Sequence, residues 1–293
     1  MSACIDLHCH TTLSDGQCSP DLVCDLAQRN GIKYLAITDH NFDNPDLDAL
    51  RARHPGLHIL RGCEFSCMYQ TADDRRVEIH VVGLNYDPAC EPLRKILAQN
   101  QPDRRGYVTA HLEKLRALGI DISYDEVLEE AQGESVGRPH IARVLRKRGV
   151  VSGFPQAFEL YLGYYGAAYV PRTLLSPEEG VSLMANLGAV VSFAHPMLIR
   201  CPPSWFDEII PQLKEAGLGA IEAYHSEHSA RDERFCVDLA ARYGLGVSGG
   251  SDYHGTAKPG VSLGRGKGGL RVTVALLDAL KARALPDNVR PNA

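Results

Sequence analysis

The sequence predicts an α/β protein built as a closed, irregular barrel of about seven β/α units, interrupted by a small all-helical insertion. Short apolar runs alternate with amphipathic helices, which is typical of a parallel sheet with helices outside it. This alternation stops between about residues 99 and 168, where helices follow one another without a convincing strand. The 293 residues, 44% of them hydrophobic, are enough for one large core. A doubly wound open sheet is the alternative architecture.

The first part of the barrel, residues 1–98, is expected to hold four strands. Ser19, Pro20 and Asp21 form a typical helix start, and Gly31 ends that helix. The apolar runs predict strands at residues 5–7, 34–38, 59–64 and 77–83, and a second helix from Asn44 to about His54.

The insertion and the second part of the barrel follow. Within residues 99–168 the sequence predicts helices at residues 107–118, 124–131, 139–148 and 154–162. The alternation resumes within residues 169–293, with strands at 189–193, 218–223 and 245–248 and helices at 176–188, 205–216, 229–243 and 274–283.

Histidines and carboxylates recur where the predicted strands end. His8 and His10 stand two residues apart in an extended run, so both side chains point to the same side. The full set at or near strand ends is His8, His10, His40, Glu64, His80, His195, Asp252 and His254, with Asp15 in the first loop. The carboxyl ends of barrel strands form one face, which carries the active site. We therefore expect these nine residues to converge on a metal site.

Nine ligands exceed the four that one zinc ion normally takes, and they suit two or three ions if one carboxylate bridges. Nitrogen and oxygen ligands without a thiolate favour manganese, iron or zinc. Two neighbouring divalent ions activate water and stabilise both oxygens of an in-line displacement at phosphorus. The set of residues therefore indicates a metal-dependent hydrolase that acts on phosphate esters.

Charge, hydropathy and cysteine content indicate which partners the protein binds and in which compartment it is found. The net charge of -5 gives no electrostatic reason to bind long nucleic acid. The sequence has no export signal and no apolar run near the roughly 18 residues of a membrane span. Nine cysteines without a Cys-x-x-Cys pair favour reduced thiols over a disulfide framework. We expect a cytoplasmic protein with no membrane association and no evident obligate protein partner.

The order of these motifs resembles that of the polymerase and histidinol phosphatase (PHP) family. The motifs are Asp6-Leu-His8-Cys-His10, Asp15-Gly16, Thr38-Asp39-His40, Gly62-Cys-Glu64, Glu78-Ile-His80, Ala194-His195-Pro196 and Ser251-Asp252-Tyr-His254. The resemblance implies a distorted (β/α)7 TIM-like barrel with a trinuclear centre, within the amidohydrolase-like enzymes. It also implies three ligand sets: His8, His10, Glu64 and Asp252; Glu64, His80 and His195; and Asp15, His40 and His254. Several members have histidine where this chain has Asp15, and the harder carboxylate favours Mn²⁺, with Zn²⁺ and Fe²⁺ as alternatives.

The insertion resembles that of one branch of the family, which hydrolyses nucleotide 3′,5′-bisphosphates or trims RNA from its 5′ end. There a Gly-Arg-Pro-His segment covers the barrel mouth, and Gly137-Arg138-Pro139-His140 matches it. An arginine at a helix start joins its guanidinium to free backbone N–H groups, which suits phosphate binding. Arg104, near the start of the insertion, and His225, after a strand end, are further predicted substrate contacts.

The leading hypothesis is a phosphatase that removes the 3′-phosphate of nucleoside 3′,5′-bisphosphates and leaves 5′-nucleotides. A hydroxide bridging two ions near Glu64 would attack phosphorus, with Asp252 and His195 completing the predicted catalytic group. The alternatives are a 5′→3′ exoribonuclease acting on short 5′-phosphorylated RNA and a histidinol-phosphate phosphatase. A metal-binding module without catalysis is the alternative from another class.

Overall fold

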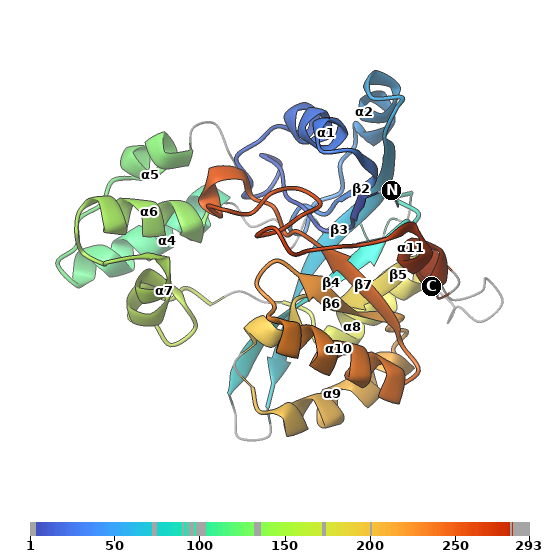
Figure 1. Ribbon diagram of the computed structural model, residues 1–293. Coiled ribbons are helices and arrows are strands. Elements are labelled where there is room, and N and C mark those ends of the chain that lie inside the picture. Colours follow the sequence, from blue (N-terminus) through green and yellow to red (C-terminus); the bar gives the residue numbers. More distant parts are fainter. Residues whose placement is uncertain are drawn as a thin grey trace. The chain divides into compact units, whose positions relative to one another are not determined.

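The computed structural model describes residues 4–71, 75–89, 91, 93, 97, 104–131, 136–171, 174–199, 201–281 and 283. The chain divides into two compact units (Figure 1). The first, called the barrel unit, comprises Met1–Leu97 and Leu174–Ala293, and the second, called the helical unit, is Ala98–Thr173. The sequence predicted the insertion at residues 99–168, and its predicted first boundary lies outside the described residues.

One sheet of seven strands forms the barrel unit, and its strands lie side by side in the order of the chain. The strands are β1 (Cys4–Asp6), β2 (Ile32–Ile37), β3 (His58–Gln70), β4 (Arg76–Leu84), β5 (Val190–Phe193), β6 (Ala220–His225) and β7 (Gly246–Gly250). Strands β1, β2 and β3 are parallel to one another, as are β5, β6 and β7.

The sheet nearly closes on itself because the segments that follow β1 and β7 meet. The backbone N–H of His10 donates to the carbonyl oxygen of Tyr253 (2.9 Å), and that of Asp252 donates to the carbonyl oxygen of His8 (2.8 Å). The predicted distorted seven-stranded barrel is therefore confirmed, and the open doubly wound sheet is excluded.

Strand β4 runs antiparallel to both β3 and β5, so the expectation of an all-parallel sheet is wrong at this strand. The sequence predicted that the third strand ends at Glu64, but β3 continues to Gln70. Only residues 71–75 then connect β3 to β4. So short a connection joins antiparallel strands, because a parallel pair needs a crossover of a dozen residues or more.

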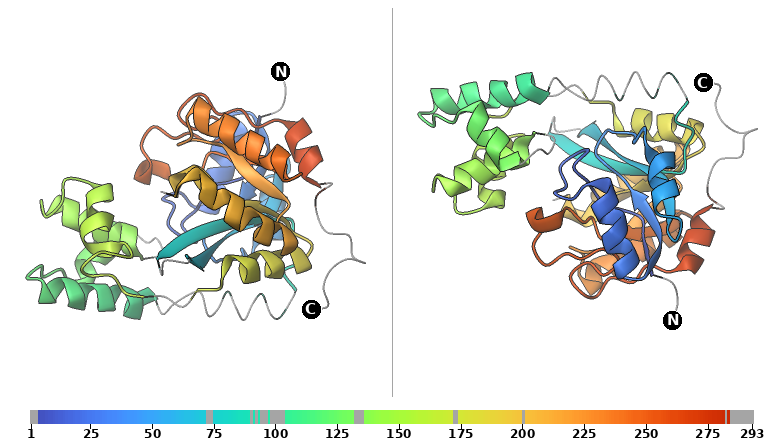
Figure 2. Two further views of the ribbon diagram at one scale, coloured as in Figure 1. Left: turned by 90° about the horizontal axis from the view of Figure 1, so that it is seen from below. Right: turned by 90° about the horizontal axis from the view of Figure 1, so that it is seen from above.

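Helices lie around the outside of the sheet, as Figure 1 and Figure 2 show. They are α1 (Pro20–Arg29), α2 (Leu47–Arg53), α8 (Pro177–Asn186), α9 (Pro203–Glu215), α10 (Ala230–Arg242) and α11 (Val274–Lys281). The hydroxyl of Ser19 accepts from the backbone N–H of Leu22 and fixes the start of α1. Ser176 and Ser229 begin α8 and α10 with capping boxes.

Apolar packing between helices and strands holds the strand ends in place. Phe65 and Phe193 of the sheet belong to one buried cluster with Phe206 and Ile209 of α9. Burial of each such side chain stabilises the fold by roughly 1.5–3 kcal/mol. Among the described residues, no helix combines the length and the apolar character needed to cross a lipid bilayer.

The helical unit has a core of its own. Its elements are α4 (Arg104–Ala117), α5 (Tyr124–Ala131), α6 (Arg138–Lys147), α7 (Phe154–Ala157) and a π-helical turn at Phe158–Leu162. Val108, Leu115, Ile141 and Leu162 are fully buried in one cluster within this unit. Described residues of this unit form no strand, as the sequence predicted.

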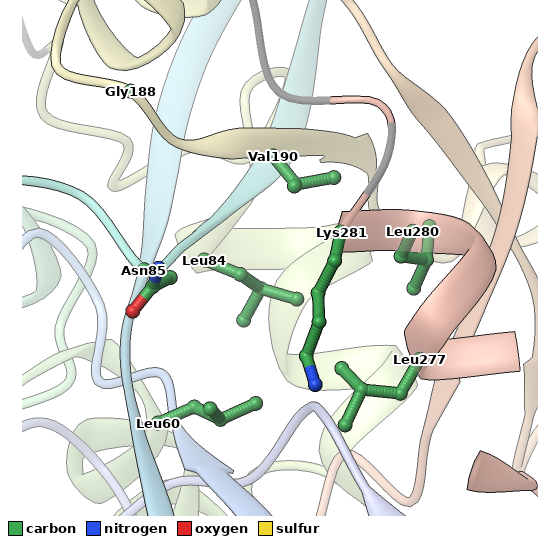
Figure 3. A pocket seen from close by; sticks show the side chains of 8 residues that line it. All are labelled: Leu60, Leu84, Asn85, Gly188, Val190, Leu277, Leu280 and Lys281. Carbon is green, nitrogen blue, oxygen red and sulfur yellow. The ribbon is translucent and has the colours of Figure 1, made fainter.

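A pocket of about 200 Å³ lies at the end of the barrel where the parallel strands begin. Figure 3 shows its apolar lining by Leu60, Leu84 and Val190, with Leu277 and Lys281 of α11 on the other side. Val190 begins β5, and Leu84 ends the antiparallel β4. This end is opposite to the one at which the predicted metal ligands stand, so the pocket is not the predicted site.

Candidate metal centre

Glu64 lies at the centre of the predicted ligands. Its Oε2 atom is 3.2 Å from His8 Nε2, 3.1 Å from His10 Nε2 and 3.1 Å from His40 Nδ1. Its Oε1 atom is 2.9 Å from His80 Nδ1 and 2.8 Å from His195 Nε2. The two oxygens of one buried carboxylate therefore face two different groups of imidazoles.

Asp252 joins the first of these groups. Its Oδ1 atom lies 3.3 Å from His10 Nε2 and 3.6 Å from His8 Nε2. Asp15 lies at the centre of a third group, since its carboxylate is 3.3 Å from His254 Nε2 and 3.7 Å from His40 Nε2. The structure therefore brings together all nine predicted ligands: His8, His10, Asp15, His40, Glu64, His80, His195, Asp252 and His254.

The donors fit divalent metal ions. Glu64 Oε2, His40 Nδ1 and His195 Nδ1 are buried and have no hydrogen bond of good geometry within the described part of the chain. Leaving a buried carboxylate oxygen unsatisfied is costly, and such groups in native proteins need a partner. Overlapping groups of three or four of these ligand atoms lie within 4.8 Å of one another. Imidazole nitrogen and carboxylate oxygen are suitable ligands for manganese, iron and zinc.

Without metal, the carboxylates retain protons on neighbouring imidazoles. Burial disfavours the imidazolium of His10, but Asp252 and Glu64 outweigh it and raise the pKa of His10 to about 9. Burial is likewise outweighed at His80, where Glu64 and Glu78 raise the pKa to about 10. Metal binding must displace these protons, because a metal ligand nitrogen needs its lone pair.

Glu64 and His80 reach the centre from within a hairpin. In the register of β3 and β4, Glu64 pairs with Val82 and His80 pairs with Ser66. Glu64 and His80 are thus diagonal neighbours on one face of the sheet. The expectation that they stand at or near the carboxyl ends of separate strands is corrected for both, because β3 continues to Gln70 and β4 runs in the opposite direction.

Two backbone features position other ligands: the close approach of β7 to the end of β1, and positive φ angles at two of the ligands. A Cβ atom on Gly250 would lie 2.3 Å from the Cβ of His8, so only glycine lets β7 approach the end of β1 so closely. His195 (φ 28°) and Asp252 (φ 51°) adopt left-handed backbone conformations that are uncommon for residues other than glycine. Such conformations cost of order 1–3 kcal/mol and cluster at functional sites.

Glu222, inside β6, is a residue to which the sequence assigned no role. Its Oε1 atom accepts from His8 Nδ1 (2.9 Å), and its Oε2 atom accepts from the backbone N–H of His195 (2.7 Å). Burial would raise the pKa of Glu222, but His8 outweighs it and lowers the pKa to about 2. The bond to Nδ1 fixes the orientation of the His8 ring, so that its Nε2 atom faces Glu64. The signal was an acid inside an otherwise apolar predicted strand.

Two buried aspartates within the motifs hold the loops that carry ligands. Asp39 accepts from the backbone N–H of Thr11 (2.8 Å) and from the hydroxyl of Ser14 (2.6 Å). Asp6 accepts from the backbone N–H groups of Ser251 (2.8 Å) and Gly264 (2.7 Å). The motifs Asp6-Leu-His8 and Thr38-Asp39-His40 contained these residues, but their partners are distant in sequence.

The predicted substrate contacts divide between the units. His225 belongs to the barrel unit, where its Nε2 atom donates to Asp252 Oδ2 (3.1 Å) and its Nδ1 atom accepts from the backbone N–H of Glu227 (3.1 Å). Arg138 begins α6 of the helical unit, with its guanidinium over the ring of Phe158. The side chain of Arg104 lies outside the described residues. Contact of these three residues with substrate stays a prediction.

Curated relatives with similar sequences are phosphoesterases. The chain is 31% identical over 265 residues to the 3′,5′-nucleoside bisphosphate phosphatase of Chromobacterium violaceum, which covers 89% of this chain and 90% of the relative. It is 29% identical over 263 residues to the 5′-3′ exoribonuclease Rnm of Escherichia coli, which covers 89% of this chain and 88% of the relative.

Solved structures agree with the fold. An amidohydrolase from Chromobacterium violaceum, determined with bound sulfate and no metal, superposes with a TM-score of 0.82 and 29% identity, over 97% of this chain and 98% of that one. A candidate metal-dependent phosphoesterase from Bifidobacterium adolescentis superposes with a TM-score of 0.79 and 28% identity, over 96% of both chains.

The family profile described as "PHP domain" matches residues 6–162, a span that includes six of the nine clustered ligands and the helical unit up to the π-helical turn. The remaining ligands, His195, Asp252 and His254, come from the second part of the same barrel. With the ligand cluster, the barrel and the relatives in agreement, we conclude that the chain belongs to the PHP family and is a metal-dependent phosphoesterase.

Proposed function

We propose that the protein hydrolyses the 3′-phosphate of nucleoside 3′,5′-bisphosphates and releases 5′-nucleotides. The observation that carries this proposal is that the two carboxylate oxygens of Glu64 face separate groups of imidazoles. With this geometry Glu64 would help to hold two neighbouring ions, and two such ions would stabilise the attacking and leaving oxygens of an in-line displacement at phosphorus. The relative that is 31% identical and is named for this reaction supports the choice of substrate.

Three ions, most suitably Mn²⁺, would be held by the three predicted ligand sets: His8, His10, Glu64 and Asp252; Glu64, His80 and His195; and Asp15, His40 and His254. When bound, such ions supply an activated water and neutralise the charge that develops on the phosphate oxygens. Glu64 and Asp252 would anchor these ions, since both carboxylates are buried. Neighbouring histidines hold the pKa of Glu64 well below its usual range, and Lys258 with neighbouring histidines does the same for Asp252.

Exposure indicates the side from which the substrate approaches. The side chains of His8, His10 and Glu64 are at most 1% exposed, whereas those of His40 and His80 are 25% and 21% exposed. The phosphate would therefore meet the partly exposed ligands first. A small phosphorylated nucleotide is the proposed substrate, and Arg138 is proposed as a further contact with its phosphate.

A 5′→3′ exoribonuclease activity on short RNA is the second candidate, supported by the relative in Escherichia coli that is named for it and is 29% identical. The same ligands would serve a phosphodiester, with the 5′-phosphate as an anchor. The acidic net charge of -5 disfavours affinity for long RNA but not for short oligonucleotides.

Product analysis with Mn²⁺ tests the proposal. The purified protein is incubated with a nucleoside 3′,5′-bisphosphate, a short 5′-phosphorylated oligoribonucleotide or histidinol phosphate. We expect the bisphosphate to give the 5′-monophosphate and inorganic phosphate at the highest kcat/KM. A ladder of released mononucleotides at higher kcat/KM would establish the exoribonuclease instead, and preferred hydrolysis of histidinol phosphate would exclude both.

Glu64→Gln is the matched test of the site. The amide keeps the shape of the side chain but removes the charge between the imidazoles, so we expect loss of bound Mn²⁺ and of nearly all phosphate release. Glu215→Gln, on the exposed end of α9, is the control and should behave as the wild type. Full activity in Glu64→Gln would exclude a bridging carboxylate.

A further inference from the structure

We propose that Lys258 is a phosphate-binding residue of the metal centre. This inference rests on the proposed phosphoesterase site and adds a residue to it that no sequence motif indicated. Lys258 follows the short 3-10 helix Gly255–Ala257, four residues after His254. The turn between them brings a lysine side chain back to the ligands.

The ammonium of Lys258 pairs with Oδ2 of Asp252, while Oδ1 of the same carboxylate faces His10 and His254. The lysine thus stands immediately beside the ligand cluster. Its side chain is 30% exposed, whereas that of Asp252 is 4% exposed. The ammonium therefore lies on the solvent side of the buried carboxylate.

Lys258 is not the sole hydrogen-bond donor to Oδ2 of Asp252 among the described residues. His225 Nε2 also donates to Asp252 Oδ2 (3.1 Å), and the backbone N–H of Glu227 donates to His225 Nδ1 (3.1 Å), which fixes the proton on Nε2. Asp252 therefore keeps a hydrogen-bond donor when the ammonium moves away. Lys258 is free to exchange Asp252 for a phosphate oxygen without leaving a buried carboxylate oxygen unsatisfied.

The backbone beneath Lys258 is held against the first loop, which carries Asp15. The backbone N–H of Gln17 donates to the carbonyl oxygen of His254 (3.2 Å), and Thr256 Oγ1 hydrogen-bonds the side chain of Gln17. Gly255 turns with φ 72° at this contact, and a Cβ there would lie 3.0 Å from Gln17 Cβ. A fixed backbone with a long flexible side chain suits an ammonium that moves between two anionic partners.

A phosphate group is the ligand that this arrangement fits. The ammonium offers three donors and a full charge, and charge-assisted hydrogen bonds to phosphate are about twice as strong as neutral ones. The alternative is that Lys258 only orients Asp252. The two roles differ in their effect on metal: an orienting role changes Mn²⁺ content, whereas phosphate binding does not.

The test measures the dissociation constant for inorganic phosphate and the Mn²⁺ content of the Mn²⁺-loaded protein. For Lys258→Met we expect phosphate binding to weaken by about tenfold or more, which corresponds to the loss of one charge-assisted hydrogen bond. The Mn²⁺ content should equal that of the wild type. Lys258→Arg should retain phosphate affinity within about threefold, because the positive charge remains.

Lys267→Met is the control, since this exposed lysine of the same loop pairs with the side chain of Glu227. It should bind phosphate as the wild type does. Unchanged phosphate affinity in Lys258→Met, or a loss of Mn²⁺ from that variant, would overturn the proposal. Because phosphate is a product of any phosphomonoester, the measurement is independent of the nucleotide. The wild-type protein could also fail to hydrolyse bisphosphates while its phosphate binding still depends on Lys258. That result would reject the proposed substrate but not the proposed role of Lys258.

Discussion

At the scale of single residues, the metal centre is a set of imidazoles whose protons depend on nearby carboxylates. Burial would raise the pKa of Glu64, but the imidazoles of His40, His8 and His80 outweigh it and hold this pKa well below its usual range. His8 directs Nδ1 to Glu222, and His254 directs Nδ1 to the backbone carbonyl oxygen of Asp252. These bonds fix the orientation of both rings before any ion arrives, so that Nε2 of His8 faces Glu64 and Nε2 of His254 faces Asp15.

Mn²⁺ binding should release protons and should strengthen as the pH rises. The pKa values of about 9 for His10 and about 10 for His80 lie above the usual value, so both rings are protonated at pH 7 in the metal-free protein. Each displaced proton should raise the affinity about tenfold per pH unit between pH 6 and 8. Calorimetry in buffers of different ionisation enthalpy measures this release, and an affinity independent of pH would contradict it.

Glu222→Gln should weaken Mn²⁺ binding by about 10- to 100-fold, the usual effect of losing a partner of a metal ligand. The glutamine amide has one acceptor oxygen, so it cannot serve both His8 Nδ1 and the backbone N–H of His195. Equilibrium dialysis measures the affinity, and circular dichroism checks the fold. Glu215→Gln controls for the loss of one negative charge, and equal Mn²⁺ affinity in the two variants would reject this role.

At the scale of elements, the centre is assembled where β1 and β7 meet and where the β3–β4 hairpin passes them. Register decides which side chains face the ions, because a slip of one residue turns every side chain of a strand to the other face. The segment after β1 is fixed by its bonds to Tyr253 and Asp252, so His8 and His10 have one register.

Gly250→Ala tests this contact of β1 with β7. The new Cβ would meet His8 Cβ at 2.3 Å and His8 N at 2.4 Å, so the backbone of one strand must move. Overpacking of this kind costs roughly 1–3 kcal/mol, and we expect lower stability in urea together with reduced Mn²⁺ content. Gly269→Ala is the control, since nothing lies within 4 Å of its added methyl group. Two variants of equal stability and metal content would show that the contact does not constrain the site.

At the scale of the whole molecule, the ligands join parts of the chain that are far apart. They come from the region of β1 at one extreme and from the segment after β7 at the other, and the helical unit is inserted between β4 and β5. The unfolded chain does not hold these residues together, so ions bind the native barrel in preference to the unfolded state.

Mn²⁺ should therefore raise the midpoint of thermal unfolding. At a free concentration 100 times the dissociation constant, each site should add about 2.7 kcal/mol to the free energy of unfolding. Differential scanning calorimetry with and without chelator measures the shift, and Glu64→Gln should show a smaller one. A midpoint that does not change at saturating Mn²⁺ would mean that the nine residues do not hold ions in the folded state.

The sequence by itself determined the alternation of strands and helices, the position of the insertion in the chain and the nine clustered residues. These features are local: helix caps such as Ser19 and the alternation of His8 and His10 depend on neighbours a few residues away. Their order along the chain carries the family resemblance, so the sequence predicts the convergence of the nine residues without knowledge of their contacts.

Only the tertiary structure decided the direction of β4 and the partners of the ligands. The direction of β4 follows from the length of β3, which the apolar pattern did not reveal beyond Glu64. Glu222 meets His8 across 214 positions of sequence, and a pairing of this kind leaves no local pattern. Lys258 likewise gains its place from packing against the first loop. Long-range contacts depend on how elements pack, because a residue's own neighbours in sequence do not specify its distant partner.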